Sequence, residues 1–227
     1  MVAIVREVVK SRLSTGSRRA VRALIEELKL QRVHRRSLRE ARRYLDRGDL
    51  KLHFGSGPNH KPGWVNIDLD RRADLQLDLR EDLPFRDGSV GIIYSEHFFE
   101  HLEYPREVNH LLREARRVLK PGGVFSVGVP DTEFALRAYV FSREEFFRIN
   151  KERGWHPPWC RTRMHQINYH FRQAGEHKWQ YDLETLAQVL TDAGFVDATR
   201  RAFDPSLDSE YHCTPWGTLY VDARKPG

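Results

Sequence analysis

The spacing of hydrophobic positions changes near residue 50 and divides the chain into two parts. Before that point, apolar residues recur mostly at intervals of three and four, with arginines between them, at Val21, Leu24, Ile25, Leu28 and Leu30. This spacing is typical of an amphipathic helix, and a similar but less apolar pattern follows over residues 34–47. We therefore expect a helical N-terminal arm of one or two helices in residues 1–49 and a separate domain in residues 50–227.

From residue 50 onward, short apolar runs alternate with turns and with two helical patterns. Strands are predicted over residues 51–55, 64–69, 74–79, 90–95, 124–129, 196–203 and 218–224. A helix is predicted over residues 105–120, and a second one is expected to begin after Asp182 and to end at Gly194, since Asp caps helix N-termini and Gly ends helices. Strands that alternate with helices indicate a mainly parallel, doubly wound α/β sheet.

The composition is that of an ordinary globular domain, with 40% hydrophobic and 31% charged residues among 227. No apolar run approaches the ~20 residues that a membrane span needs, and the apolar stretch at the start is too short to predict a signal peptide. Two cysteines, Cys160 and Cys213, cannot form a disulfide framework, so we expect a cytoplasmic location. The sequence does not indicate an oligomeric state.

The net charge of +6 is concentrated in the arm. Residues 1–50 hold 14 Lys and Arg against 6 Asp and Glu, whereas the remaining residues hold 24 against 26. Either the arm packs on the body with a solvated basic face, or it makes a peripheral contact with an anionic surface. No aromatic residue lies between the arginines before Tyr44, which argues against single-stranded nucleic acid as the partner.

Glycine and acidic residues follow the first predicted strands. The first strand ends in the sequence HFGSGPN at residues 53–59, and the second ends in Asp68 and Asp70. Ligands of parallel sheets bind at the carboxyl ends of the strands, and glycine allows a ligand to approach the backbone closely. A carboxylate at the end of the second strand is suited to bind a ribose diol. The pattern therefore predicts a nucleotide-type cofactor at this edge of the sheet.

Several stretches in this order resemble the class I S-adenosylmethionine-dependent methyltransferases. They are residues 52–59, residues 65–70, LDLREDLPFRDGSVGIIYSEHFFEHL at 77–102 and LLREARRVLKPGGVFSVGVPD at 111–131, and the resemblance extends more loosely over 181–224. It implies a Rossmann-like, seven-stranded sheet whose last strand is antiparallel, with S-adenosylmethionine as the cofactor.

The resemblance also implies roles for residues at the first two strand ends. Gly55, Ser56 and Gly57 would pass under the methionine part of the cofactor, and Asp68 would hold the ribose hydroxyls. Only ten residues separate Gly57 from Asp68, where the family has a full helix. The connection is therefore expected to be a turn, with Asp70 as the alternative ribose ligand. An NAD site is disfavoured because it needs a helix N-terminus under the pyrophosphate at this point.

The next two strands would complete the cofactor site. By the same resemblance, Asp78 would accept a hydrogen bond from the adenine amino group, and the backbone N–H of Leu79 would bind the same ring. Ser95 and Glu96, directly after the fourth strand, would border the methionine end and the methyl group.

A rival motif follows the fourth strand. Residues 97–101 form the string H-x-x-E-H, in which inverted zincins hold zinc with two histidines and use the glutamate as a base. A zinc metallopeptidase using His97, Glu100 and His101 is therefore one alternative. The family often has a Glu-His-x-x-Glu-His run here, so we expect Glu100 and His101 to pack at a helix start, His97 to line the acceptor site, and no metal site.

Residues 141–181 are rich in aromatic and imidazole side chains, with three of the five tryptophans and four histidines. In the family, the segment after the fifth strand commonly forms a cap over the acceptor site, where aromatic residues would give a mostly apolar pocket. The alternative is that this cap insertion only builds a small core of its own.

The resemblance implies methyl transfer to a hydroxyl or amine of an acceptor. A hydroxyl acceptor needs a base, for which His97, then His177 and His170, are the candidates. Nucleic-acid enzymes often have Asn/Asp-Pro-Pro-Tyr after the fourth strand, where this chain has Tyr94-Ser95-Glu96-His97, so a nucleic-acid acceptor is not expected. A small molecule, a sugar of a glycan or a lipid-linked group is expected instead; a non-catalytic binding protein on the same fold is the other alternative.

Overall fold

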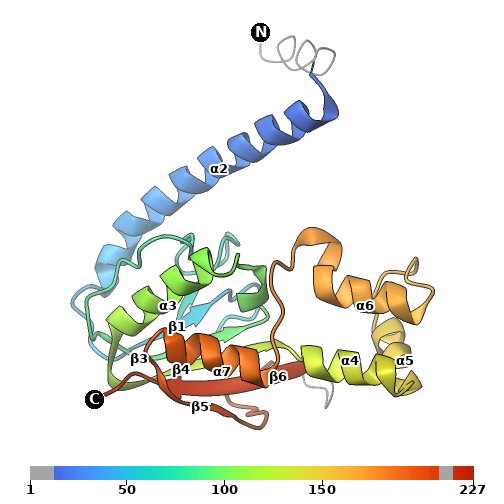
Figure 1. The fold of residues 1–227 in the computed structure, drawn as a ribbon. Helices are drawn as coiled ribbons and strands as arrows, with labels where there is room; N and C mark the ends of the chain where they lie inside the picture. The colour runs from blue at the N-terminus through green and yellow to red at the C-terminus, as the bar shows by residue number, and fades with distance from the viewer. Residues whose placement is uncertain (1–12, 210–216) are drawn as a thin grey trace.

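The computed structural model describes residues 13–209 and 217–227, so Cys213 and the start of the arm lie outside the described residues. One mixed sheet contains all six strands, in the order β2-β1-β3-β4-β6-β5 (Figure 1). The strands are β1 (Leu50–Phe54), β2 (Val65–Ile67), β3 (Val90–Glu96), β4 (Leu119–Pro130), β5 (Val196–Arg200) and β6 (Thr218–Arg224). The helices are α2 (Thr15–Glu40), α3 (Arg106–Val118), α4 (Thr132–Val140), α5 (Glu144–Glu152), α6 (Arg163–Arg172) and α7 (Leu183–Asp192), with 3-10 turns η1 (Ala41–Tyr44), η2 (Phe99–His101) and η3 (Gln173–Gly175).

The topology confirms the α/β Rossmann-like prediction, including the antiparallel last strand. Strands β2, β1, β3 and β4 are parallel to one another, and β6 is antiparallel to both β4 and β5. The predicted number of seven strands is wrong, because the segment 74–79 forms only an isolated bridge between Leu75 and Ile67. Its N–H groups at Gln76 and Asp78 donate instead to Ser37 Oγ and His34 Nδ1 of α2.

The two faces of the sheet are covered in different ways. On one face, apolar side chains of the strands pack with α3 and α7 into the main core, to which α3 contributes five fully buried residues. On the other face, His53, Tyr94, Ser126 and Asp222 lie in register across four strands. Arg201 covers this polar row and donates to Ser126 Oγ and Asp222 Oδ1. As predicted, no helix connects β1 to β2; the described residues 55–64 form turns.

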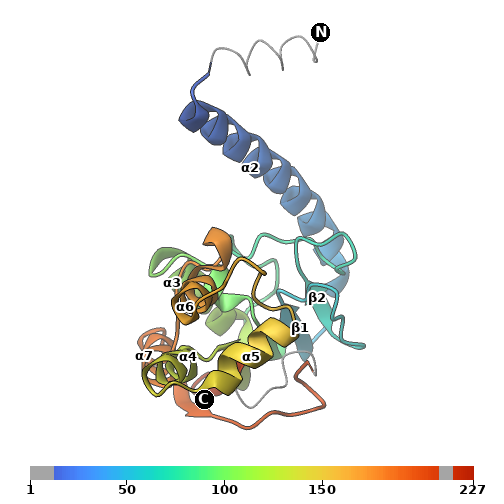
Figure 2. The same cartoon turned by 90° about the vertical axis from the view of Figure 1, so that its right-hand side faces the viewer.

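Within the described residues, the arm consists of α2 and the short η1. Helix α2 packs on the body near its C-terminal end, makes an ion pair from Glu27 to Arg80, and projects away from the body towards its N-terminal end (Figures 1 and 2). Ser37 and the following Ala41 and Tyr44 are buried. By contrast, Leu24 is 60% and Leu28 48% exposed. None of the described helices is long and apolar enough to cross a membrane.

Helices α4, α5 and α6 lie together beyond the end of β4. They have a small core of their own, formed by Ala135, Ala138, Phe146, Phe147 and Ile167. The segment that we call the cap therefore begins with α4 at Thr132, earlier than the predicted position 141, and ends with the strand-like contact of Tyr181 with Asp131.

Candidate active site

A cavity of about 480 Å³ lies between the carboxyl ends of the central strands and the cap. Its lining comes from Pro130 at the end of β4 and from four other parts of the chain. They are the turn after β1 (Gly55 to Asn59), the end of β3 and η2 (Glu96, His97, Glu100, His101), the cap (chiefly Trp155, His156, Tyr169, His170 and His177) and the start of β6 (Gly217, Thr218). Of the predicted site residues, the cavity brings together Gly55, Ser56, Gly57, Glu96, His97, His170 and His177, while Asp68, Asp78, Leu79 and Ser95 do not line it.

The turn after β1 is shaped to let a ligand approach the backbone. Gly55 has a φ of +63°, and a Cβ at this position would lie 2.4 Å from Phe98 Cβ, so both the backbone conformation and the space require glycine. The hydroxyl oxygens of Ser56 and Ser95 are buried and find no hydrogen-bond partner among the described residues. Buried polar atoms without a partner favour a bound group at this place, so these residues fit the cofactor that the resemblance implies.

Two carboxylates at the end of β2 differ in how they are engaged. Asp68 Oδ2 accepts a 2.8 Å hydrogen bond from Gly57 N, and its Oδ1 accepts one from Asp70 N. This contact ties the glycine turn to β2 and leaves each Asp68 oxygen with further acceptor capacity. Asp70 forms a two-pronged pair with Arg72, which holds the pKa of the Asp70 carboxyl well below its usual range. The geometry favours Asp68 as the ribose ligand.

Asp78 is buried and already paired. Burial alone would raise the pKa of its carboxyl, but the guanidinium of Arg80, 2.7 Å from Oδ2, keeps that pKa below the ordinary value. Leu79 beside it is also buried. An adenine amino group would therefore share the Asp78 carboxylate with Arg80, and the adenine role of Asp78 and Leu79 stays a prediction.

Glu96 is fixed at the end of β3 by two donors from other segments. Its Oε1 accepts a 2.7 Å hydrogen bond from the Tyr220 hydroxyl on β6, and its Oε2 accepts one from Ser209 N. Burial, together with the nearby Glu96 carboxylate, raises the pKa of Tyr220, so the phenol keeps its proton and donates it in this bond. The carboxylate is thus held rigidly at the cavity wall.

His97 adopts a backbone conformation that is uncommon for residues other than glycine, with a φ of +50°. Its N–H donates to the Gly128 carbonyl of β4, and its ring Nε2 lies 2.8 Å from Thr218 Oγ1. The other ring nitrogen, Nδ1, lies 3.5 Å from Glu100 Oε1. Left-handed residues held by their surroundings are concentrated at functional sites, and His97 faces the cavity at the point where three strands end.

The structure does not support the alternative of an inverted-zincin site. That motif needs two histidines one turn apart on a helix, whereas residues 99–101 form a single 3-10 turn and His97 lies before it in the left-handed region. The side chains that gather as potential metal ligands are instead Glu100, His101 and the distant His177, without His97.

The two cap histidines named from the sequence lie in different environments. His177 Nδ1 lies 2.9 Å from the backbone carbonyl of His170 near the end of α6. Burial lowers the pKa of His177, and it lowers the pKa of His170 to about 3. Both rings are therefore neutral near pH 7, and His170 is too weak a base to accept a proton there.

Several cavity residues had no assigned role in the sequence analysis. Trp155 and Tyr169 belong to the aromatic segment that predicted a cap pocket, but sequence alone could not separate them from Trp159, which is 57% exposed and does not line the cavity. His156 is buried and bonded to Gln166. Only the fold reveals which of these aromatic and imidazole side chains face inward.

Comparisons with known proteins agree with this architecture. The family model described as "Methyltransferase domain" matches residues 64–127, a stretch that begins after the glycine turn and ends within β4. An uncharacterized protein of Methanocaldococcus jannaschii is 24% identical over 132 residues, which are 53% of this chain and 63% of that protein. The chain thus spans less than two thirds of this curated relative.

A solved structure of low sequence identity is similar in fold. A chain from the complex of the Haloferax volcanii Trm112 methyltransferase activator with a methyltransferase has a TM-score of 0.52 and 17% identity, over 90% of this chain and 97% of that one. An Archaeoglobus fulgidus protein described as a methyltransferase has a TM-score of 0.46 and 16% identity, over 88% and 94% of the two chains.

Proposed function

We propose that the chain is a class I S-adenosylmethionine-dependent methyltransferase and that it methylates a hydroxyl group of a small-molecule, sugar or lipid-linked acceptor. The observation that supports this proposal most strongly is the single cavity that joins the glycine turn after β1 to the histidine and aromatic side chains of the cap. A cofactor on the first wall and an acceptor on the second would meet inside the same cavity.

On the cofactor side, Gly55, Ser56 and Gly57 would lie under the methionine part, Asp68 would hold the ribose hydroxyls, and Glu96 would border the methyl group. When bound, S-adenosylmethionine supplies a methyl carbon activated by its positive sulfur, so an oxygen–carbon bond forms as the carbon–sulfur bond breaks. The chain's own task is to align the acceptor and to exclude water.

His97 is the base that we propose for the acceptor hydroxyl. It lies at the cavity wall, and its ring is oriented by Thr218. It would take the hydroxyl proton as the oxygen attacks. His177 is the second candidate, since its Nε2 faces the cavity region near Glu100. The low pKa of His170 makes it the weakest of the three.

The cap wall supports a ring-shaped acceptor with polar substituents. Trp155 and Tyr169 offer apolar ring faces, and Asn150 and Gln173 offer polar groups beside them. Such mixed walls are typical of small-molecule sites.

A cytoplasmic location stays a prediction.

The proposed acceptor class is tested by incubating the enzyme with S-adenosylmethionine carrying a labelled methyl group and separated cell fractions. We expect label in the small-molecule, glycan or lipid fraction, as the methyl ether of a hydroxyl. Label only in the nucleic-acid fraction would refute the proposed acceptor class. The His97→Asn variant is the control, because label that the enzyme transfers should be much reduced with this variant.

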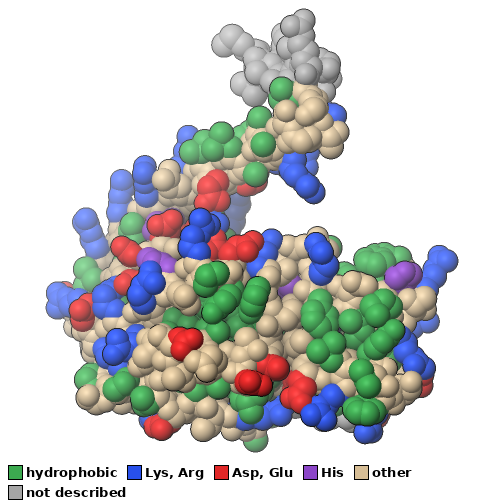
Figure 3. Space-filling model, viewed as in Figure 1, with side chains coloured by type: hydrophobic (Ala, Val, Ile, Leu, Met, Phe, Trp, Pro, Cys, Tyr) green, Lys and Arg blue, Asp and Glu red, His purple; other side chains and the backbone are tan. Residues whose placement is uncertain are grey.

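We further propose that the arm holds the enzyme at an anionic lipid surface. Val21, Leu24, Ile25 and Leu28 are all exposed and lie at i, i+3, i+4 and i+7, the spacing of one helix face. By helical spacing Arg18 and Arg22 border this stripe, both are exposed, and Figure 3 shows Lys and Arg side chains along the arm. An apolar stripe flanked by basic residues is typical of helices that lie in a membrane interface.

Vesicle co-sedimentation tests this role of the arm. We expect the wild type to bind vesicles containing anionic lipid, and the double variant Leu24→Gln, Leu28→Gln to bind much less. Neutral vesicles are the control for charge. Deleting residues 1–45 would be a poor test, because it also removes Ala41 and Tyr44 from the core. Equal binding by the wild type and the double variant would refute this role.

A further inference from the structure

Glu100 is a carboxylate whose burial is not compensated by hydrogen bonds. The residue is 1% exposed, and neither Oε1 nor Oε2 has a hydrogen-bond partner among the described residues. A buried charge is costly unless it is paired or coordinates a metal. The environment of Glu100 therefore calls for a positive charge within reach of its oxygens.

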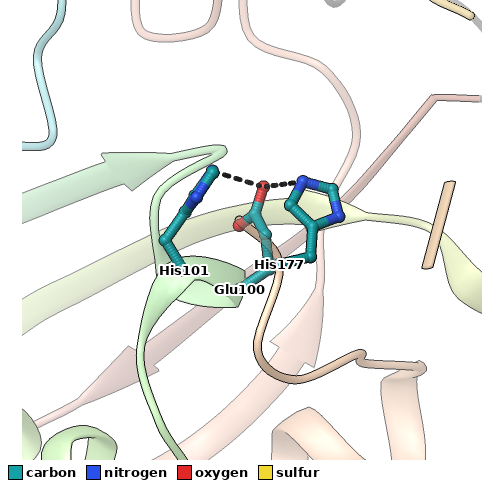
Figure 4. A group of neighbouring side chains, drawn as sticks. All are labelled: Glu100, His101 and His177. Carbon is teal, nitrogen blue, oxygen red and sulfur yellow. Dashed lines mark ion pairs between the residues drawn. The ribbon is translucent and has the colours of Figure 1, made fainter. Parts of the chain in front are cut away.

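Two imidazole nitrogens face the same oxygen. His101 Nε2 lies 4.0 Å and His177 Nε2 3.9 Å from Glu100 Oε1, and the three potential ligand atoms all lie within 4.8 Å of one another. Figure 4 shows the carboxylate between the two rings. Ligand atoms of a tetrahedral metal with bonds of about 2.0–2.1 Å would lie roughly 3.3 Å apart, so small rotations of these side chains would close the site.

The orientation of His177 matches that of a metal ligand. His177 Nδ1 lies 2.9 Å from the His170 carbonyl and 3.3 Å from Gln180 Nε2. A carbonyl oxygen can only accept, so the shorter of the two contacts favours the tautomer with the proton on Nδ1. In the neutral ring, Nε2 then presents a lone pair to the Glu100 carboxylate, which leaves two acceptors facing each other. Histidines that bind metals commonly donate their other ring N–H to a carbonyl or carboxylate in this way.

The backbone brings these distant residues together. Lys178 N and Trp179 N both donate to the Glu100 carbonyl, at 2.7 and 3.2 Å, and the ring of Trp179 packs on that of Tyr104. The segment that holds His177 is thereby fixed against η2. These contacts hold the backbone segments that carry Glu100, His101 and His177 next to one another.

We propose that Glu100, His101 and His177 bind one divalent transition-metal ion at the wall of the cavity. Imidazole and carboxylate ligands suit zinc and its first-row neighbours. Three protein ligands leave at least one coordination position open, as in catalytic metal sites. All three residues line the cavity, so that open position would face the acceptor.

The role of this ion rests on the proposed function. It would bind an oxygen of the acceptor and favour its ionised form, close to His97, whose Nδ1 lies 3.5 Å from Glu100 Oε1. The site would thus fix which acceptor oxygen is presented. Acceptors with two neighbouring oxygen substituents, which could chelate the ion, are the class that it would select.

Metal-stripped full-length protein titrated with Zn²⁺ by calorimetry, and with Co²⁺ by visible absorption, tests the site. We expect one ion per chain and, with Co²⁺, the absorption bands of a low-symmetry histidine and carboxylate site. The variants His101→Ala and His177→Ala should each bind at least 100-fold more weakly. His165→Ala removes an exposed cap histidine outside the ligand set and should bind like the wild type.

The outcomes separate this site from the methyltransferase assignment. Thermal melts with S-adenosylhomocysteine, run on the same variants, report whether each one is folded and binds cofactor. No ion bound by the wild type, or equal binding by both ligand variants, would overturn the metal site even if the cofactor binds. If His177→Ala does not fold, the partly exposed His101 still gives the decisive variant.

Discussion

The two walls of the cavity are built in opposite ways. The cofactor wall is made of backbone turns and carboxylates that follow β1, β2 and β3, and its main tie, from Gly57 N to Asp68 Oδ2, spans eleven residues of sequence. The opposite wall is a cluster of histidines around Glu100, assembled from η2 and from a cap segment more than 70 residues later. One wall is local in sequence, and the other exists only after the chain has folded.

This contrast separates binding from chemistry. The cofactor wall presents hydroxyls, backbone groups and carboxylates. The histidine wall holds the groups that could move a proton or bind a cation. We therefore expect substitutions on the first wall to change cofactor affinity and substitutions on the second to change turnover.

The largest expected effect is on the histidine wall. His97→Asn keeps a residue that tolerates a positive φ but removes the proposed base. Turnover of the labelled acceptor should fall about 100- to 10,000-fold, while the affinity for S-adenosylhomocysteine stays unchanged. Undiminished turnover would exclude His97 as the base. A parallel loss of cofactor affinity would show that the histidine wall also contributes to cofactor binding, contrary to the expectation stated above.

A smaller effect is expected on the cofactor wall. Removing a hydrogen bond to a charged group costs about 1.5–3 kcal/mol, so Asp68→Ala should weaken S-adenosylhomocysteine binding roughly 10- to 100-fold by calorimetry. Asp70→Ala is the matched control, since its carboxylate is two residues away and already paired with Arg72. If Asp70→Ala has the larger effect, the ribose ligand is Asp70. The melting temperature without ligand shows whether either variant has lost stability through the Gly57 contact.

The smallest effect concerns acid stability. Burial lowers the pKa of His53, just before the glycine turn, to about 4. Between pH 6.5 and pH 4 the unfolded chain takes up a proton at this residue and the folded chain does not, so acid favours unfolding. From pH 7 to pH 5 this one residue should remove about 2 kcal/mol of stability.

Urea unfolding of the wild type and of His53→Phe at the two pH values measures that effect. The variant keeps a ring beside Tyr94 but cannot titrate, so its loss of stability on acidification should be smaller by that amount. Equal losses would show that His53 is not the buried neutral group described here.

The same contrast explains how far the sequence could predict the structure. The presence of six of the seven expected strands, the turn in place of the first helix and the capping of α7 by Asp182 depend on neighbours in sequence, and these predictions agree with the structure, although several strand bounds differ. The third expected strand failed because Gln76 and Asp78 bond to α2, a contact that no local pattern reports. The inverted-zincin alternative does not form, because His97 has a left-handed backbone conformation and so cannot belong to the helix that the spacing of the H-x-x-E-H string suggests. His177 was a candidate base, but its place beside Glu100 could not be inferred from either segment alone.

If the glycine turn forms a site for S-adenosylmethionine, as proposed, S-adenosylhomocysteine should stabilise the folded chain, and a thermal melt measures this stabilisation. A ligand at about 100 times its dissociation constant adds about 2.7 kcal/mol, and for a chain of this size each kcal/mol raises the midpoint by roughly 2–4 °C. We predict a rise of roughly 5–10 °C with S-adenosylhomocysteine and none with NADH. No rise at millimolar S-adenosylhomocysteine, or an equal rise with NADH, would contradict the account.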